Sequence, residues 1–174
     1  MKKFALAMVA WGMALPVLAD GLRVENCVIR ETIPGASTTA AYFDLHRDST
    51  MAGEYRWTAD EQIIAVTVPT ITDTPELHNV REENGTMKMY QVSHIAVNDG
   101  LTQLKPGSFH AMLMDIKQGA AVGEQYPLTI RFASHPEIVC QAEVLTRDAI
   151  RQRHDQHGQH GQHKKGGQHG HHHH

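Results

Sequence analysis

The chain has 174 residues, of which 41% are hydrophobic, 20% are charged and 6% are aromatic, and its formal net charge is −3. This composition is typical of a globular protein, and it excludes a collagen-like fibre, a coiled coil and a wholly disordered chain. The acidic balance argues against a nucleic-acid partner. Two cysteines are too few for a zinc ribbon or an iron–sulfur cluster built from this chain alone.

Residues 1–19 have the pattern of a cleaved signal peptide. The positive start Met1-Lys2-Lys3 precedes an uncharged, mostly apolar run that ends in the small-x-small triplet Val17-Leu18-Ala19. The run is shorter than the about 20 apolar residues of a membrane-spanning helix. No cysteine follows the expected cleavage site, so we expect no lipid anchor. The sequence therefore predicts export to a bacterial periplasm, without stable membrane insertion.

Nine short segments with alternating or β-branched residues follow, and turn signals separate them. One such signal, Asn84-Gly85, lies between two strand patterns and predicts a tight hairpin. No segment has a capped helical period, so residues 20–150 are expected to form an all-β, antiparallel sandwich of about nine short strands. The predicted strands are Leu22–Arg30, Ala40–Leu45, Glu54–Trp57, Gln62–Val68, Glu76–Arg81, Thr86–Val92, Ser108–Ile116, Leu128–Phe132 and Ile138–Leu145.

The two cysteines lie in the first and the last of these predicted strands. First and last strands are often neighbours in a sandwich, so Cys27 and Cys140 are candidates for a disulfide in an oxidising compartment. Two separate buried thiols are the alternative.

Methionine and histidine occur together on two predicted strands. Residues two apart on a strand share a face, which aligns His110, Met112 and Met114 on one strand and Met87 and Met89 on another. Met residues that only fill the core are the alternative interpretation.

A further histidine, His78, lies on the strand before the Asn84-Gly85 turn, which returns the chain beside it. Imidazole and thioether together form a soft, neutral donor set. Such a set suits Cu(I) and suits magnesium or calcium poorly. The pattern therefore predicts a Cu(I) site.

The spacing of these residues resembles the signature of the periplasmic copper chaperones called the PCuAC family, His-x10-Met-x(about 21)-His-x-Met. Here ten residues separate His78 from Met89, and twenty separate Met89 from His110-x-Met112. The similarity covers most of Arg23–Leu145. Flanking segments that also match are Pro34-Gly35-Ala36, Ala40-Ala41-Tyr42, Glu76-Leu77-His78, Asn84-Gly85 with Met87-Lys88-Met89, and Leu104-Lys105-Pro106-Gly107 with Phe109 to Met114.

The resemblance implies a cupredoxin-like β-sandwich that binds one Cu(I) through His78, Met89, His110 and Met112. It also implies delivery of copper to an acceptor such as the dinuclear copper centre of cytochrome c oxidase, alongside a thiol-dependent copper chaperone. The expected activity is binding and ligand exchange by a monomer, not catalysis.

The sequence departs from the family pattern at two points. Asn79 follows His78 where many members have methionine or glutamate, and the second spacer is one residue short. The Ser93–Gln103 segment, expected to be a loop, could absorb the shorter spacer. Met87 remains a candidate substitute ligand, and Met114 is expected to be a hydrophobic wall or an additional contact.

The segment after Ile150 has a different character. Nothing in residues 151–174 is apolar, so the segment is expected to be disordered. Imidazoles without thioethers favour Cu(II), so this tail is expected to recruit Cu(II). A purification tag is an alternative origin for the last four histidines. The expected tail ligands are His154, His157, His160, His163, His169, His171, His172, His173 and His174.

Two functions are alternatives to that of a copper chaperone. A periplasmic copper or zinc storage or resistance protein would depend mainly on the tail. A blue-copper electron carrier would need a cysteine ligand followed closely by histidine and methionine. Cys140 is followed by Gln141-Ala142-Glu143-Val144-Leu145, which argues against the electron carrier.

Overall fold

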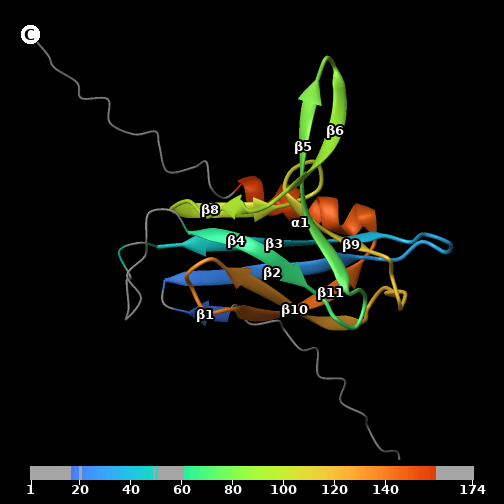
Figure 1. The fold of residues 1–174 in the computed structure, drawn as a ribbon, viewed down its shortest axis with the longest axis horizontal. Helices are drawn as coiled ribbons and strands as arrows, with labels where there is room; N and C mark the ends of the chain where they lie inside the picture. Colours follow the sequence, from blue (N-terminus) through green and yellow to red (C-terminus); the bar gives the residue numbers. More distant parts are fainter. Residues whose placement is uncertain (1–16, 20, 49, 51–60, 160–174) are drawn as a thin grey trace, which may run out of the picture.

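Strands occupy most of residues 17–19, 21–48, 50 and 61–159, the part of the chain that the computed structural model describes (Figure 1). The predicted fold class, an all-β cupredoxin-like sandwich, is confirmed. The strands are β1 (Val17–Ala19), β2 (Leu22–Arg30), β3 (Thr39–Arg47), β4 (Gln62–Thr67), β5 (Thr74–Glu83), β6 (Thr86–Val92), β7 (Ile95–Ala96), β8 (Gly100–Leu104), β9 (His110–Met114), β10 (Gln125–Phe132) and β11 (Ile138–Leu145), and one helix follows, α1 (Arg147–Gln159).

The strands form one continuous sheet in the order β6-β5-β9-β3-β2-β11-β10-β4-β7, with β1 beside β2 and β8 beside β3. Every pair is antiparallel except β2 and β11, where Val28 pairs with Glu143 in parallel. This pair is an exception to the antiparallel pairing expected from the sequence. A hairpin forces its strands to be antiparallel, whereas β2 and β11 are joined by nearly the whole domain and have no such constraint.

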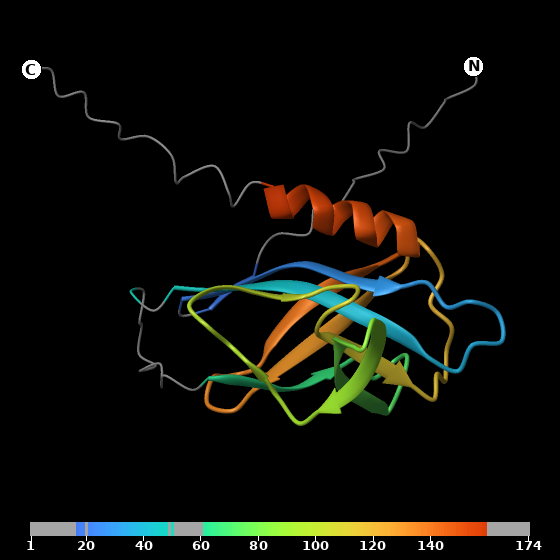
Figure 2. The same ribbon diagram turned by 90° about the horizontal axis from the view of Figure 1, so that it is seen from above.

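The hydrophobic core lies where the sheet folds over on itself, so that β4 and β10 face β2 and β3 (Figure 2). The alternation along β10 shows why this strand forms. Tyr126, Leu128, Ile130 and Phe132 point into the core, and the residues between them are more exposed. Full burial of one such side chain contributes about 1.5–3 kcal/mol.

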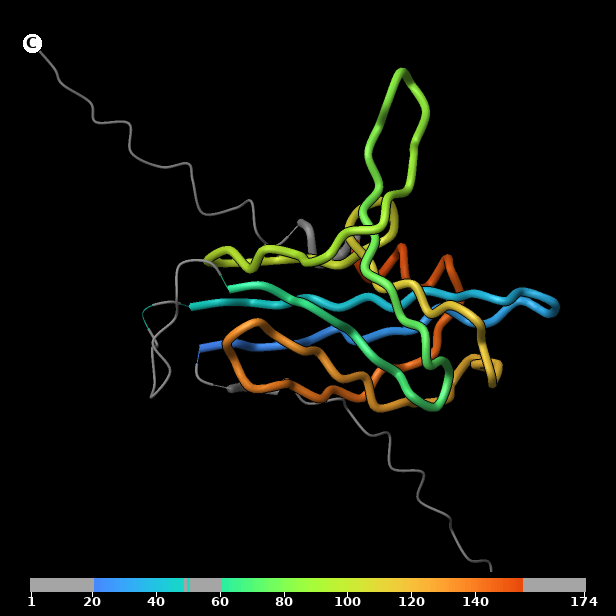
Figure 3. The backbone as a smooth tube through the Cα atoms, in the orientation of Figure 1, coloured from blue at the N-terminus to red at the C-terminus, as the bar shows by residue number. Residues whose placement is uncertain are grey.

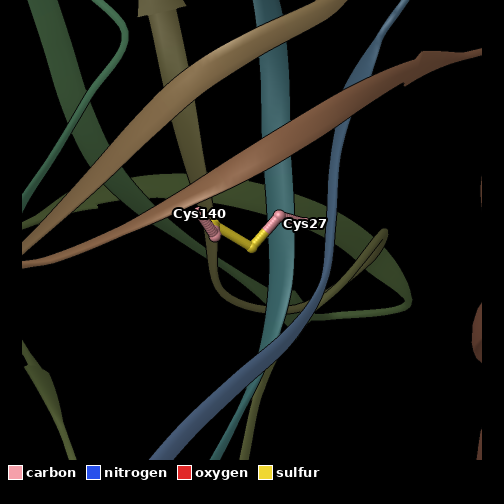
Figure 4. Close-up of a disulfide and its surroundings, with 2 residues drawn as sticks. All are labelled: Cys27 and Cys140. Carbon is pink, nitrogen blue, oxygen red and sulfur yellow. A yellow bond between two sulfur atoms is a disulfide. The ribbon is translucent and has the colours of Figure 1, made fainter. Parts of the chain in front are cut away.

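A disulfide joins Cys27 on β2 to Cys140 on β11, and both residues are buried in the core (Figure 4). The two cysteines are 113 residues apart in the chain. In the chain-entropy model, a closed loop of about 100 residues stabilises the folded state by about 4.7 kcal/mol. The bridge therefore links the two ends of the domain.

Some predicted boundaries agree with the structure and others do not. The predicted strands Leu22–Arg30, Thr86–Val92 and Ile138–Leu145 have the observed bounds. Ser93–Gln103, expected to be a loop, instead contains β7 and part of β8, because these short segments pair with β4 and β3, which lie far away in the chain. The predicted strand Glu54–Trp57 lies outside the described residues.

The segment expected to be cleaved as a signal peptide contributes β1, which pairs with β2 from Val17 opposite Val24 to Ala19 opposite Leu22. Cleavage after Ala19 would remove this strand and leave β2 paired with β3 and β11. Within the described residues, no helix is long and apolar enough to cross a membrane.

The prediction that the chain is disordered from Arg151 onward is wrong for residues 151–159, because these belong to α1. The helix lies along the outer face of the layer that contains β2 and β3 (Figure 2). Ile150 is fully buried there against Val28, Ala40 and Tyr42. A single apolar residue marks the buried face of this helix, which is too weak a signal for a helical period.

Polar contacts also hold α1 in place. The Thr146 hydroxyl accepts a hydrogen bond from the Ala149 amide at 3.2 Å, in the manner of an N-cap. Arg153 donates to Glu143 on β11 at 2.9 Å. Asp148 in the first turn is favoured by the helix dipole.

Candidate metal centre

The centre of the candidate site is the pairing of β5 with β9. His78 lies directly opposite His110, and Glu76 lies directly opposite Met112. Directly opposed residues point to the same face of a sheet, as do residues two apart on one strand. His78, Glu76, His110 and Met112 therefore share one face. Ala111, between the two β9 ligand candidates, is fully buried in the core on the opposite face.

The hairpin partner of β5 adds methionine to the same face. Met89 on β6 lies opposite Val80, which is two residues from His78, so Met89 is a diagonal neighbour of His78. Diagonal neighbours are about 7–8 Å apart at Cα, within reach of long side chains. The turn Asn84-Gly85 has positive φ at both residues, 52° and 77°, as a two-residue primed turn requires.

The two additional methionines are placed farther from the imidazoles. Met87 pairs with Glu82, two residue pairs further along the hairpin than Met89. Met114 pairs with Thr74 and lies four residues from His110, which is roughly 13 Å along a strand. The register thus brings Met89 and Met112 nearer to the two histidines than Met87 or Met114.

The distance between the two imidazoles fits a shared metal ion. Their ring centroids are 5.8 Å apart with an interplanar angle of 42°. A metal–imidazole bond is about 2 Å long, which places each centroid about 3 Å from the metal and the two centroids within about 6 Å of each other. His78 and His110 therefore already lie at the separation that a common ligand role demands.

Each imidazole is engaged through one nitrogen. His110 Nδ1 lies 2.9 Å from the Ser108 carbonyl oxygen, and His78 Nε2 lies 2.7 Å from Glu76 Oε2. His78 Nδ1 is buried and has no hydrogen-bond partner among the described residues. Because buried polar atoms are nearly always satisfied, this orphaned nitrogen is an observation in favour of a ligand at the site.

Burial of His110, which is 4% exposed, lowers the pKa of its imidazole. The hydrogen bond to the Ser108 carbonyl opposes this effect, and the neighbouring His78 adds to it. The lowered pKa favours the neutral imidazole, which is the form that binds a metal ion.

The methionine sulfurs lie in two different environments. Met112 packs against the outer cluster of Val28, Ala40, Tyr42 and Ile150 beneath α1. Met89 is 52% exposed, on a hairpin that extends away from the rest of the sheet (Figures 1 and 3). One thioether is thus held by packing, and the other is accessible from solvent.

Histidine, cysteine and carboxylate side chains alone do not form a metal site among the described residues. No group of three or more such side chains that could hold a metal ion occurs within residues 17–19, 21–48, 50 and 61–159. A metal ion bound between His78 and His110 would need methionine sulfur as well.

The tail histidines divide into two sets. His154 is buried in α1, where its ring lies 6.3 Å from that of Tyr42 and its Nδ1 lies 3.9 Å from Asp44 Oδ1. The expectation that His154 lies in a disordered tail is therefore wrong, because it packs against the sheet four residues after Ile150. His157 also belongs to α1, and the seven histidines from His160 to His174 lie outside the described residues.

Two contacts in the site were not predicted from the sequence. Glu76 holds His78, and the Ser108 carbonyl holds His110. The position of Glu76 two residues before His78 was a usable signal, because it places both side chains on one face of a strand. The contact of Ser108 is made by its backbone, which leaves no signal in residue type.

The fold and the face of paired histidines and methionines place this chain among PCuAC-type β-sandwiches. The copper-bound PCuAC domain from PmoF2 is 16% identical, with a TM-score of 0.59 over 76% of this chain and 98% of that chain. Apo-DR1885 from Deinococcus radiodurans is 20% identical, with a TM-score of 0.52 over 84% of this chain and 93% of that chain. No curated protein matches the chain.

The chain belongs to the LpqE-like family, whose model matches residues 22–144. The predicted membership of a PCuAC-type family is thereby confirmed. The family model is named for a lipoprotein, whereas Asp20-Gly21, with no cysteine, follows the expected cleavage site in this sequence.

Proposed function

We propose that this protein is a periplasmic copper chaperone that binds one Cu(I) through His78, Met89, His110 and Met112. The observation that carries the proposal is the pair of imidazoles 5.8 Å apart, with an orphaned buried nitrogen, on a face that also bears both methionines. Similar folds described as a copper-bound PCuAC domain and as CuI-DR1885 support it.

Transfer by ligand exchange follows from the unequal exposure of the ligands. An acceptor's own ligands would displace Met89 first, because its side chain is half exposed on the hairpin. Met112, which packs beneath α1, would be released last. The acceptor that the family resemblance suggests is the dinuclear copper centre of cytochrome c oxidase, with a thiol-dependent chaperone as a second partner. The chain would act by binding and exchange, not as an enzyme.

The chain would then have three parts. Residues 1–19 are the proposed signal peptide, and residues 20–150 with the rest of α1 form the copper-binding body. The proposed Cu(II)-recruiting tail is shorter than the sequence indicates, because α1 packs on the body through Ile150 and His154. The tail ligands would be the histidines after His154.

The rival is a copper or zinc storage or resistance protein, favoured by the nine histidines between His154 and His174. A chain ending at Gln159 separates the two functions, because it keeps α1 and removes seven of these histidines. A chaperone keeps one tight, colourless Cu(I) per shortened chain and still transfers it to an oxidase copper domain. A storage protein loses most of its metal capacity.

The site is tested in the same shortened chain by competition with a chromogenic Cu(I) chelator. Met89→Leu/Met112→Leu preserves side-chain volume but removes both thioethers, and the tight site should be lost. Met87→Leu/Met114→Leu is the matched comparison, and it should retain one Cu(I). Unchanged affinity in the first double variant would overturn the ligand assignment, and loss only in the second would transfer it to Met87 and Met114.

A further inference from the structure

The two histidines of the candidate site are held by different ring nitrogens. His110 Nδ1 lies 2.9 Å from the carbonyl oxygen of Ser108. A carbonyl oxygen only accepts hydrogen bonds, so Nδ1 of the neutral ring must carry the proton and donate it. The lone pair of His110 is therefore on Nε2.

His78 has the opposite arrangement. Its Nε2 lies 2.7 Å from the Glu76 carboxylate, which as an ionised group only accepts hydrogen bonds. The proton of neutral His78 is therefore on Nε2, and the lone pair is on Nδ1. This is the nitrogen that is buried without a hydrogen-bond partner in the part of the chain that the structure describes.

We propose that Glu76 is a positioning residue that fixes the tautomer of His78, so that copper is bound by Nδ1 of His78 and by Nε2 of His110. This inference rests on the proposed copper-binding function and specifies its atoms. A carboxylate that accepts the second N–H of a metal-bound imidazole orients the ring and raises its basicity as a ligand. Ser108 would do the same for His110 through its carbonyl oxygen.

Glu76 can position His78 because the two residues are close together on the same strand. Glu76 and His78 are two residues apart on β5 and share a face, and Glu76 lies opposite Met112. The side chain of His78 is 13% exposed and that of Glu76 is 34% exposed. The hydrogen bond is thus shielded on the imidazole side, and Glu76 does not need to move for a metal ion to reach Nδ1.

The alternative is that copper binds Nε2 of His78. If copper bound Nε2 of His78, the Glu76 hydrogen bond would have to break each time copper binds, and Glu76 would oppose binding. Removal of the carboxylate would then strengthen Cu(I) binding. Under the proposal, its removal weakens binding.

The first experiment reads the tautomers directly. Long-range ¹H–¹⁵N spectra of the ¹⁵N-histidine-labelled mature chain at about pH 8, where free imidazoles are neutral, distinguish a protonated from an unprotonated ring nitrogen. His78→Gln and His110→Gln assign the two rings. We expect His78 as the Nε2–H form and His110 as the Nδ1–H form. His78 as the Nδ1–H form would overturn the proposal.

Addition of one equivalent of Cu(I) without oxygen then tests the ligand atoms. The expected result is a shift of the ¹⁵N signals of His78 Nδ1 and His110 Nε2, with His78 Nε2 still protonated. A metal shift at His78 Nε2 would overturn the inference and keep the copper site. Shifts confined to the tail histidines would instead overturn the proposed function, and the copper part of the inference with it.

Variants of Glu76 test its contribution to affinity. Glu76→Leu removes the acceptor, and we expect a mixture of His78 tautomers and Cu(I) affinity reduced about 10–100-fold. Glu76→Gln keeps an acceptor oxygen and should restore most of both. Glu82→Leu is the matched control on the same strand and face, opposite Met87, and should change neither. Unchanged tautomer and affinity in Glu76→Leu would contradict the proposal.

Discussion

The candidate site combines residues of β9 with residues of the β5–β6 hairpin, and these two regions differ in burial. On β9, His110 is buried, and the intervening Ala111 and Leu113 are fully buried in the core. On the hairpin, every residue of β6 from Thr86 to Gln91 is exposed, and among the described strands β6 is an edge strand that pairs with β5 alone. The β9 residues of the site are therefore fixed by core packing, whereas Met89 lies on the exposed part of the hairpin, where β6 is positioned by its pairing with β5.

This difference explains how one site could bind copper and also release it. A ligand fixed by the core is already in place, so less conformational entropy is lost when the metal binds. A half-exposed ligand on an edge hairpin can be approached by another protein. Exposed side chains contribute little to the core, so stability does not account for the exposed methionines on β6, and the proposed exchange of copper would give them a role.

The largest expected effect concerns the anchoring of the β9 half. Leu113→Ala should destabilise the protein by about 2–5 kcal/mol, because it leaves a cavity at a fully buried position. Met87→Ala on the hairpin, where the side chain is 57% exposed, should change stability by no more than about 0.5 kcal/mol. Urea unfolding measures both. Equal losses would show that the hairpin is as tightly packed as β9.

The next effect concerns the thioethers as separate ligands. Met89→Leu and Met112→Leu should each weaken Cu(I) binding by at least about tenfold, equivalent to about 1.4 kcal/mol. Transfer to an acceptor should suffer more in Met89→Leu, because Met89 is the ligand that an acceptor reaches first. Chelator competition and stopped-flow transfer give the two quantities. Equal transfer rates in the two variants would contradict the proposal that the acceptor displaces Met89 first.

A smaller effect distinguishes the methionines by their access to oxidant. In the apo protein, peroxide should convert Met87 and Met89 to sulfoxide faster than Met112, because both are more than half exposed. Loading with Ag(I), a redox-inert substitute for Cu(I), should protect Met89 and leave Met87 reactive. Peptide mass spectrometry follows each site. Protection of Met87 alone would identify it as the hairpin ligand.

The smallest effect is on the protonation of His110. Burial lowers the pKa of His110, so its NMR titration midpoint in the apo protein should fall below the ordinary value of about 6.5. The unfolded chain takes up this proton first as pH falls. His110 therefore contributes stability above about pH 6.5, and this contribution is lost toward the folded-state pKa. A midpoint at or above 6.5 would contradict the burial of the ring.

Much of the site geometry could be predicted because strand periodicity is a local property. The alternation of His110, Met112 and Met114, and the Asn84-Gly85 turn between β5 and β6, each follow from a few adjacent residues. Once the turn is known, the register places His78 near Met89. Glu76 was visible in the same alternation, although its hydrogen bond to His78 was not predicted.

The features that could not be predicted depend on distant partners. The helix α1 is stabilised by the contact of Ile150 with β2 and β3, which leaves one apolar residue as a local signal. The two residues of β7 pair with β4, more than 30 positions earlier. The parallel pairing of β2 with β11 likewise follows from the closure of the whole sheet.

The central claim is that one Cu(I) is shared by two imidazoles and two thioethers from both halves of this face. The most direct test is copper X-ray absorption spectroscopy of a chain ending at Gln159 and loaded with one equivalent of Cu(I). We expect two nitrogen and two sulfur neighbours around the copper ion, and one fewer sulfur in each of the variants Met89→Leu and Met112→Leu. A copper ion surrounded only by nitrogen, or a sulfur count unchanged in either variant, would contradict it.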